Sequence, residues 1–121
     1  MKNIFKNKKV LVTGHTGFKG SWLITWLSML DAKIMGISKD IPSDPSHYKK
    51  LEISKNIIDL RIDIRNFKKL KKKIVQFKPD FLFHLAAQPL VNVSYHDPSL
   101  TWQTNLIGTV NILETIKLLK K

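Results

Sequence analysis

The chain has 121 residues, which is enough for one domain around a single hydrophobic core. With 43% hydrophobic and 25% charged residues, it has the composition of a soluble globular protein and not of a disordered one. It contains no cysteine, which excludes disulfides and thiolate metal sites, and its apolar runs are too short to cross a bilayer.

The formal net charge of +12 raises the question of a nucleic-acid partner. Almost all of this charge is lysine, whereas bidentate contacts with phosphates and bases favour arginine, and only Arg61 and Arg65 are arginines. The densest lysine run, residues 68–73, falls on the expected solvent face of a helix. We therefore interpret the charge as a solvated surface, and we expect no nucleic-acid partner, no membrane partner and, without a signal peptide, a cytoplasmic location.

Residues 10–37 predict a strand, a helix and a second strand. Residues 10–12 form a short buried strand, and residues 34–37 form the next one. Between them, apolar residues recur at helical spacing from about Phe18 to Leu30. We expect the core face of this helix to consist of Trp22, Leu23, Trp26, Leu27 and Leu30.

The rest of the chain repeats this order after an irregular segment, residues 38–50, which carries two prolines. Strands are expected at residues 57–62 and 81–85, with a helix between them that Asn66 caps and that ends near Phe77. The inner face of this helix is expected to consist of Phe67, Leu70, Ile74 and Phe77. A loop that contains Pro89 and Pro98 should follow, and then a last helix from about Ser99 to the end, with Gly108 inside it.

This order of elements requires parallel pairing with right-handed crossovers. The expected fold class is α/β, a Rossmann-type doubly wound parallel sheet in the strand order 3-2-1-4. Only the first half of such a sheet is present, and the fourth strand would be an open apolar edge. We therefore interpret residues 1–121 as one incomplete domain, truncated before its remaining segments.

A glycine motif follows the first strand. Residues 13–20 read Thr-Gly-His-Thr-Gly-Phe-Lys-Gly, a G-x-x-G-x-x-G pattern that opens a helix. Gly14 permits the tight turn, Gly17 lets the backbone approach a pyrophosphate, and Gly20 lets the helix lie close to the sheet. The pyrophosphate would rest on the free amides at the helix N-terminus, so the motif predicts dinucleotide binding. A Walker A phosphate loop is excluded, because no Gly-Lys-Ser/Thr ends the motif.

The end of the second strand leaves the choice between NAD and NADP open. An acidic residue usually bonds the adenine ribose there, but Ser38 occupies the position and Asp40 comes two residues late. Ser38 could bond a hydroxyl or a phosphate, and Lys39 could pair with a 2′-phosphate. Asp63, just past the third strand, could accept a hydrogen bond from the adenine amino group or could be a plain turn residue.

Several further patterns resemble the extended short-chain dehydrogenase/reductase family. They are the glycine spacing, Asp63-Ile64-Arg65, the run from His84 to Ala87, and Thr104-Asn105 followed by Gly108-Thr109. Within this family, residues 14–22, 43–45 and 85–95 are similar to the nucleotide-sugar dehydratases that act on CDP-glucose. The likeness covers the whole chain but only the first part of such an enzyme. One residue departs from the pattern, since Asn92 stands where these dehydratases usually have arginine.

The resemblance implies NAD as the cofactor and a nucleotide sugar, CDP-glucose, as the substrate. The motif and the resemblance together give these candidate cofactor-binding residues: Gly14, Thr16, Gly17, Phe18, Lys19, Gly20, Ser38, Lys39, Asp63, Ile64, Leu85, Ala86, Ala87 and Thr104. Asp63 and Ile64 would lie at the adenine, and Leu85 to Ala87 with Thr104 at the nicotinamide side. Gln88 is the candidate contact with the sugar.

The resemblance also implies a reaction, in which NAD takes hydride from sugar C4, water leaves across C5 and C6, and hydride returns to C6. The family uses a Tyr-x-x-x-Lys pair, in which the lysine lowers the tyrosine pKa. Neither tyrosine here belongs to such a pair, since Glu52 lies four residues after Tyr48 and Ser99 four residues after Tyr95. We expect no catalytic residue in the chain and no turnover by the chain alone.

Three functional classes stay open: part of a nucleotide-sugar dehydratase or related epimerase, a non-catalytic dinucleotide-binding module, and a basic RNA-binding domain. The resemblance implies a homodimer for the whole enzyme, with the last helix at the interface; packing against missing segments is the alternative. The four histidines share no metal-ligand spacing, so no metal site is expected. His15 is expected to orient the glycine loop, and His84 to be a hydrogen-bonded core residue.

Overall fold

The computed structural model describes residues 2–119. Within them the helices and strands follow each other in the order β1 (Lys9–Thr13), α1 (Phe18–Met29), β2 (Lys33–Ser38), α2 (His47–Lys50), the 3-10 helix η1 (Ile53–Asn56), β3 (Ile58–Arg61), α3 (Phe67–Phe77), β4 (Phe81–His84), α4 (Val91–His96), α5 (Pro98–Trp102), the π-helix η2 (Gln103–Ile107) and α6 (Gly108–Lys117). None of these helices is long and apolar enough to cross a membrane.

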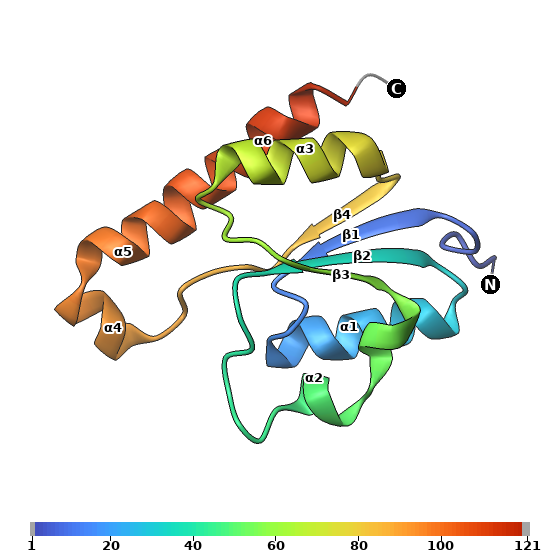
Figure 1. Ribbon diagram of the computed structural model, residues 1–121, viewed down its shortest axis with the longest axis horizontal. Helices are drawn as coiled ribbons and strands as arrows, with labels where there is room; N and C mark the ends of the chain where they lie inside the picture. Colours follow the sequence, from blue (N-terminus) through green and yellow to red (C-terminus); the bar gives the residue numbers. More distant parts are fainter. Residues whose placement is uncertain (1, 120–121) are drawn as a thin grey trace.

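The four strands form one parallel sheet in the order β3-β2-β1-β4, which confirms the predicted fold class and strand order. Helices α1 and α2 lie on one face of the sheet, and α3 and α6 lie on the other (Figure 1). The chain therefore crosses over on opposite faces after β1 and after β3. The carboxyl ends of β1 and β4 meet where the direction of the crossovers changes, which is where doubly wound sheets bind ligands.

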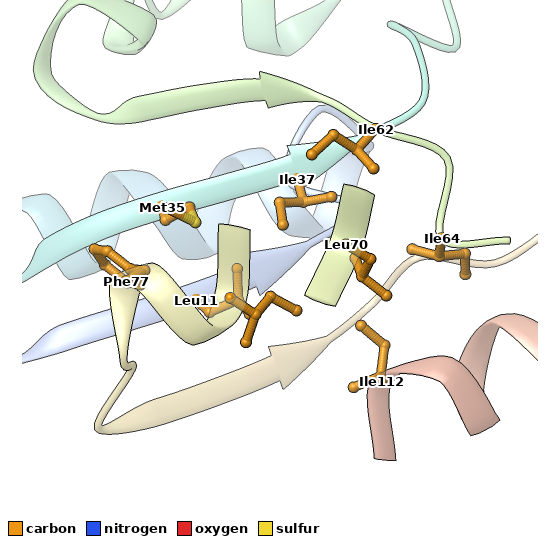
Figure 2. Close-up of a cluster of buried hydrophobic side chains, with 9 residues drawn as sticks. Leu11, Met35, Ile37, Ile62, Ile64, Leu70, Phe77 and Ile112 are labelled. Carbon is orange, nitrogen blue, oxygen red and sulfur yellow. The ribbon is translucent and has the colours of Figure 1, made fainter. Parts of the chain in front are cut away.

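Hydrophobic side chains fill the space between the sheet and the α3–α6 layer. Figure 2 shows Leu11 and Ile37 of the sheet facing Leu70 of α3 and Ile112 of α6. The rest of this cluster is Met35, Ile62, Ile64, Ile74 and Phe77. A second cluster lies on the α1 face: Val10, Val12, Ile24, Leu27, Ile34, Tyr48 and Ile53. Strand β1 is covered on both faces, which explains its unbroken apolar run.

The predicted core face of α1 is wrong for its two tryptophans. Trp22 and Trp26 are 54% and 60% exposed, whereas Gly20, Ser21, Ile24 and Leu27 are buried. Two stripes of α1 have helical spacing, and the buried one begins with Gly20 and Ser21. The same error is present at the start of α3, where Phe67 is 38% exposed while the other three predicted residues are buried.

Helix boundaries follow the local signals only in part. Asn66 caps α3 as predicted, since its side chain accepts a hydrogen bond from Lys69 N at 3.1 Å. The prediction of a loop after β4 is wrong, because that segment contains the short helix α4. The region before β3 that was expected to be irregular contains α2 and η1. The last helix begins at Pro98 and passes through the π-turn η2 into α6, with Gly108 inside the run (Figure 1). The prediction that this helix continues to the end of the chain is wrong, because α6 ends at Lys117 with Leu118 as its C-cap.

Candidate functional site

The loop between β1 and α1 lies at the carboxyl edge of the sheet, between the ends of two neighbouring strands. Gly14 N donates to Ile37 O of β2 at 2.7 Å, and Leu85 N, just after β4, donates to Thr13 O at 3.0 Å. The loop is therefore held on both sides by backbone hydrogen bonds. These bonds place the start of α1 at the switch point of the sheet.

Two glycines of the motif are required by the protein's own atoms. Gly14 has a φ of +75°, and a Cβ there would come within 2.7 Å of the backbone of Leu85 and Ala86. A Cβ on Gly20 would collide with Gly14 O and would lie 2.7 Å from His15 Cα. Gly20 thus brings α1 close to the preceding loop, whereas the sequence predicted close packing of the helix on the sheet.

Gly17 is different, because the fold makes little demand for a glycine there. Its φ of −71° suits any residue, and a Cβ would approach one atom outside its chain neighbours, Gly14 O at 3.3 Å. The space in front of Gly17 is otherwise open, which a close ligand would require.

The first amides of α1 lie next to this open space and have no acceptor inside the helix. The first intrahelical bond is from Ser21 N to Gly17 O at 2.8 Å, so the amides of Phe18, Lys19 and Gly20 precede it. No side chain caps this end, and the first turn holds no acidic residue. Phe18 and Lys19 are exposed. Bare amides and the positive end of the helix dipole together favour an anion.

His15 lies beneath the loop and is fully buried. Its Nε2 lies 2.8 Å from Asp59 Oδ1, and its Nδ1 lies 2.9 Å from Ser38 Oγ. A Cβ on Gly36 would collide with the imidazole ring, so this glycine of β2 makes room for it. The structure thus gives His15 the loop-orienting place that was expected from the sequence.

Thr16 and Ser38, two predicted cofactor ligands, turn their side chains inward. Thr16 is 5% and Ser38 is 4% exposed. Thr16 Oγ1 donates to Asp40 O at 2.6 Å, and Thr16 N donates to Ser38 Oγ at 3.3 Å. Both side chains therefore tie the glycine loop to the end of β2.

The residues predicted at the adenine lie after β3. The Asp63 carboxylate accepts hydrogen bonds from Arg65 Nη2 at 2.6 Å and from Arg65 N at 2.9 Å, and these bonds hold the pKa of Asp63 below its ordinary range. Ile64 is 4% exposed and packs in the core beside Gly108, and its carbonyl accepts from Asn111 Nδ2 at 2.9 Å, so its side chain is not available to a ligand. Lys39 is exposed and close enough to Asp63 to lower its pKa further.

The segment after β4 meets the glycine loop through Thr13. Thr13 Oγ1 accepts from Leu85 N at 3.2 Å and from Ala86 N at 3.3 Å, and it bonds His84 Nδ1 at 2.6 Å. His84 is partly buried, and burial lowers its pKa. Leu85 and Ala87 are exposed at this edge. Two of the predicted nicotinamide-side residues, Leu85 and Ala86, therefore lie beside the loop.

Gln88, the predicted sugar contact, is bonded inside the chain. Its side-chain Nε2 donates to Thr101 Oγ1 at 2.9 Å, its Oε1 accepts from Leu90 N at 2.7 Å, and its backbone exchanges two hydrogen bonds with Asn105. Thr104 lies next to Asn105 in the π-turn η2 and is half-buried. Gln88 thus fastens the loop after β4 to the last helix.

The described residues contain no group of side chains arranged to hold a metal ion. A hollow of about 790 Å³ lies at the opposite, amino end of the sheet, lined by Lys9, Lys33, Ile58 and Phe77 among others. It shares no residue with the glycine loop, so the hollow is not part of the candidate site.

Sequence reasoning missed Asp59, Tyr48 and Arg61, which surround His15. Tyr48 Oη donates to Asp59 Oδ2 at 2.7 Å, and Arg61 Nη1 donates to Asp59 Oδ1 at 2.6 Å. A signal was present, since Asp59 and Arg61 place two opposite charges in a short strand. Tyr48 and His15, however, are 11 and 44 residues away from Asp59, and no local pattern identifies them.

The known proteins that match this chain are longer than the chain itself. The family model described as GDP-mannose 4,6 dehydratase matches residues 11–121. CDP-glucose 4,6-dehydratase of Salmonella typhimurium is 48% identical over 117 residues, which cover 96% of this chain and 32% of that protein.

Two solved structures share the fold. UDP-glucose 4-epimerase of Thermus thermophilus, solved with NAD, has a TM-score of 0.81 and 29% identity, covering 92% of this chain and 34% of its own. The epimerase Mth375 of Methanothermobacter thermautotrophicus has a TM-score of 0.85 and 28% identity, and the match covers 97% of this chain and 34% of the epimerase chain. The chain thus spans about a third of the length of the relatives it matches.

Proposed function

The chain belongs to the GDP-mannose 4,6-dehydratase family, within the extended short-chain dehydrogenases/reductases, and we propose that it is the N-terminal, NAD-binding part of a nucleotide-sugar 4,6-dehydratase. The observation that carries the proposal is the open space before Gly17. Next to it, at the switch point of a parallel sheet, α1 begins with three amides that have no acceptor inside the helix. A pyrophosphate has the charge and the acceptor atoms that these amides need.

The residues of the loop fit a dinucleotide in distinct ways. The amides of Phe18, Lys19 and Gly20 would hold the pyrophosphate, and the exposed Lys19 side chain would add its charge. The open edge at Leu85 and Ala87 would take the nicotinamide-side ribose.

On the adenine side, Asp63 keeps its carboxylate ionised beside Arg65 and would accept from the adenine amino group, while Ile64 would contribute its backbone. NAD, when bound, accepts and returns the hydride of the reaction. NAD is proposed over NADP because the solved epimerase with 29% identity holds NAD.

The substrate proposed is CDP-glucose. The support is the 48% identity to a CDP-glucose 4,6-dehydratase, which exceeds the identity to the two solved epimerases. A related epimerase is the second candidate, because those epimerases share the cofactor half of the fold. The whole enzyme is proposed to be a homodimer, supported by the exposed apolar residues Leu106, Val110 and Leu113 along the last helix.

The experiment is a calorimetric titration of the chain with NAD and with NADP. Gly17→Glu puts a carboxylate into the open space and should abolish binding, since it repels the pyrophosphate and competes for the same amides. Gln76→Glu, an exposed position on α3, makes the same charge change far from the loop and should bind like the original chain. No saturable binding to either dinucleotide, or equal binding by both variants, would show the proposal to be wrong.

A further inference from the structure

A chain of hydrogen bonds runs beneath the glycine loop, from β3 to the loop backbone. It leads from Asp59 Oδ1 to His15 Nε2 (2.8 Å), from His15 Nδ1 to Ser38 Oγ (2.9 Å), and from Ser38 Oγ to Thr16 N (3.3 Å). Its members come from β3, the loop and β2, and three of them are at least 95% buried. The chain ends on the amide of the residue just before Gly17.

The direction of each hydrogen bond follows from Asp59. An ionised carboxylate can only accept, so His15 Nε2 carries the proton and donates it. Nδ1 is then bare and accepts from the Ser38 hydroxyl, whose oxygen is left to accept from Thr16 N. This order pairs a donor with an acceptor at each link of the chain, and among the described residues no buried side-chain polar atom lacks a partner.

The imidazole has no room to take another position. His15 is fully buried, its ring lies against Gly36, and the ring of Tyr48 stands edge-on to it at a centroid distance of 5.2 Å and an angle of 89°. Tyr48 and Arg61 also bond Asp59, which fixes the carboxylate. The ring therefore transmits the position of Asp59 to Ser38 and the loop.

We propose that His15, Ser38 and Asp59 are positioning residues for the cofactor, which hold the Thr16 amide inward so that the amides after Gly17 face the pyrophosphate. This inference rests on the proposed NAD binding. It also assigns the Ser38 hydroxyl to the loop and not to the ribose. Thr16 Oγ1, bonded to Asp40 O, holds the same residue from the other side.

The proposed role has a pH signature. The titratable and charged groups that face His15 are Asp59 and Arg61 of β3 and Tyr48 of α2. Burial raises the pKa of Tyr48 to about 12, so it stays a donor. Burial alone would raise the pKa of Asp59, but its hydrogen-bond donors outweigh this and lower it. Burial lowers the pKa of His15, so the imidazole is neutral at pH 8, and its protonation at acid pH makes Nδ1 a donor and reverses the bond to Ser38.

Two variants, each with a new side chain of similar shape to the original one, test the proposal by calorimetric titration with NAD from pH 5.5 to 8. Ser38→Ala removes the middle link, and Asp59→Asn can donate to His15 Nε2 and so reverses the proton order. Each should weaken NAD binding about tenfold at pH 8, the effect of roughly one hydrogen bond. The original chain should lose affinity toward acid pH, and both variants should show a flatter profile. Glu114→Gln, an exposed charge on α6, is the matched control and should behave like the original chain.

The outcomes separate the inference from the function it rests on. No NAD binding by the original chain refutes the proposed function. Binding by both variants within twofold of the original, with the same pH profile, refutes the positioning role alone. Weaker binding by Ser38→Ala together with unchanged binding by Asp59→Asn also refutes it, because Ser38 would then contact the cofactor directly. Urea unfolding of each variant checks that the chains compared are folded.

Discussion

Replacing Gly36 by alanine tests whether His15 is packed as tightly as the structure shows. The new methyl group would overlap the imidazole ring and would lie 2.7 Å from Nε2. Gly36 is in the middle of β2 and is paired with Val12 and Asp59, so the backbone cannot move away. Either the ring stays and the site is overpacked, or the ring shifts and its hydrogen bonds break.

Both responses have similar costs. Overpacking a core site costs about 1–3 kcal/mol. A shift that breaks the bonds to Asp59 and Ser38 costs about 1 kcal/mol for each of the two. Since the protein adopts the cheaper response, Gly36→Ala should lower the free energy of unfolding by about 2 kcal/mol. The free energy of unfolding of small domains is about 5–15 kcal/mol, so the variant should still fold.

A double-mutant cycle with His15→Ala isolates this effect. His15→Ala alone should cost roughly 2–4 kcal/mol, because it leaves a cavity and breaks the same hydrogen bonds. In the double variant the new methyl group meets no ring, so the second substitution should add almost nothing. Urea unfolding followed by circular dichroism should therefore give a coupling of about 2 kcal/mol. If the two costs add within about 0.5 kcal/mol, His15 does not pack on Gly36.

Three further outcomes are expected. Asn66→Ala removes the cap of α3 at Lys69 N and should cost about 1 kcal/mol in urea unfolding; no change would mean that another group caps the helix. Burial lowers the pKa of His15 and His84 below 6.5, so the unfolded chain binds more protons below that pH. Stability should be complete above pH 6.5 and should fall as the pH drops, and a pH-independent unfolding midpoint from 5 to 7 contradicts this. Trp26→Gln should change stability by less than about 0.5 kcal/mol, because the ring is 60% exposed; a loss above about 2 kcal/mol would place it in a core.

The fold was predictable because its signals are local. The β-branched run of β1, the Asn66 cap and the alternation of strands with helices each lie within a few residues, and together they require the order β3-β2-β1-β4. The face of α1 that packs on the sheet was not predictable in this way. Trp22 and Leu27 lie on different stripes with equally good spacing, and the choice depends on the sheet that the helix meets.

In the candidate site, the sequence predicted the backbone of the glycine loop but not the orientation of the side chains around it. Glycine spacing after a strand indicates a loop with free amides, and the structure has them at Phe18 and Lys19. The side chains at Thr16 and Ser38 were expected to face a ligand, but Thr16 Oγ1 donates to Asp40 O and Ser38 Oγ accepts from Thr16 N beneath the loop. Their orientation depends on His15 and Asp59, which are 44 residues apart in the chain, and a motif read along the sequence does not contain that contact.

The different roles of the glycines decide which substitutions can report on the cofactor. Alanine at Gly14 or Gly20 would meet backbone atoms of the protein itself, so a loss of NAD binding in those variants would follow from a changed fold. Gly17→Glu reaches the amides from the open side, and Ser38→Ala reaches them from beneath. Ser38→Ala adds no atom, and a Cβ at Gly17 would come close to one backbone atom, Gly14 O, at 3.3 Å. If both weaken NAD binding while the unfolding midpoint stays in place, the surface between them is the anion site, since it is the one feature that they share.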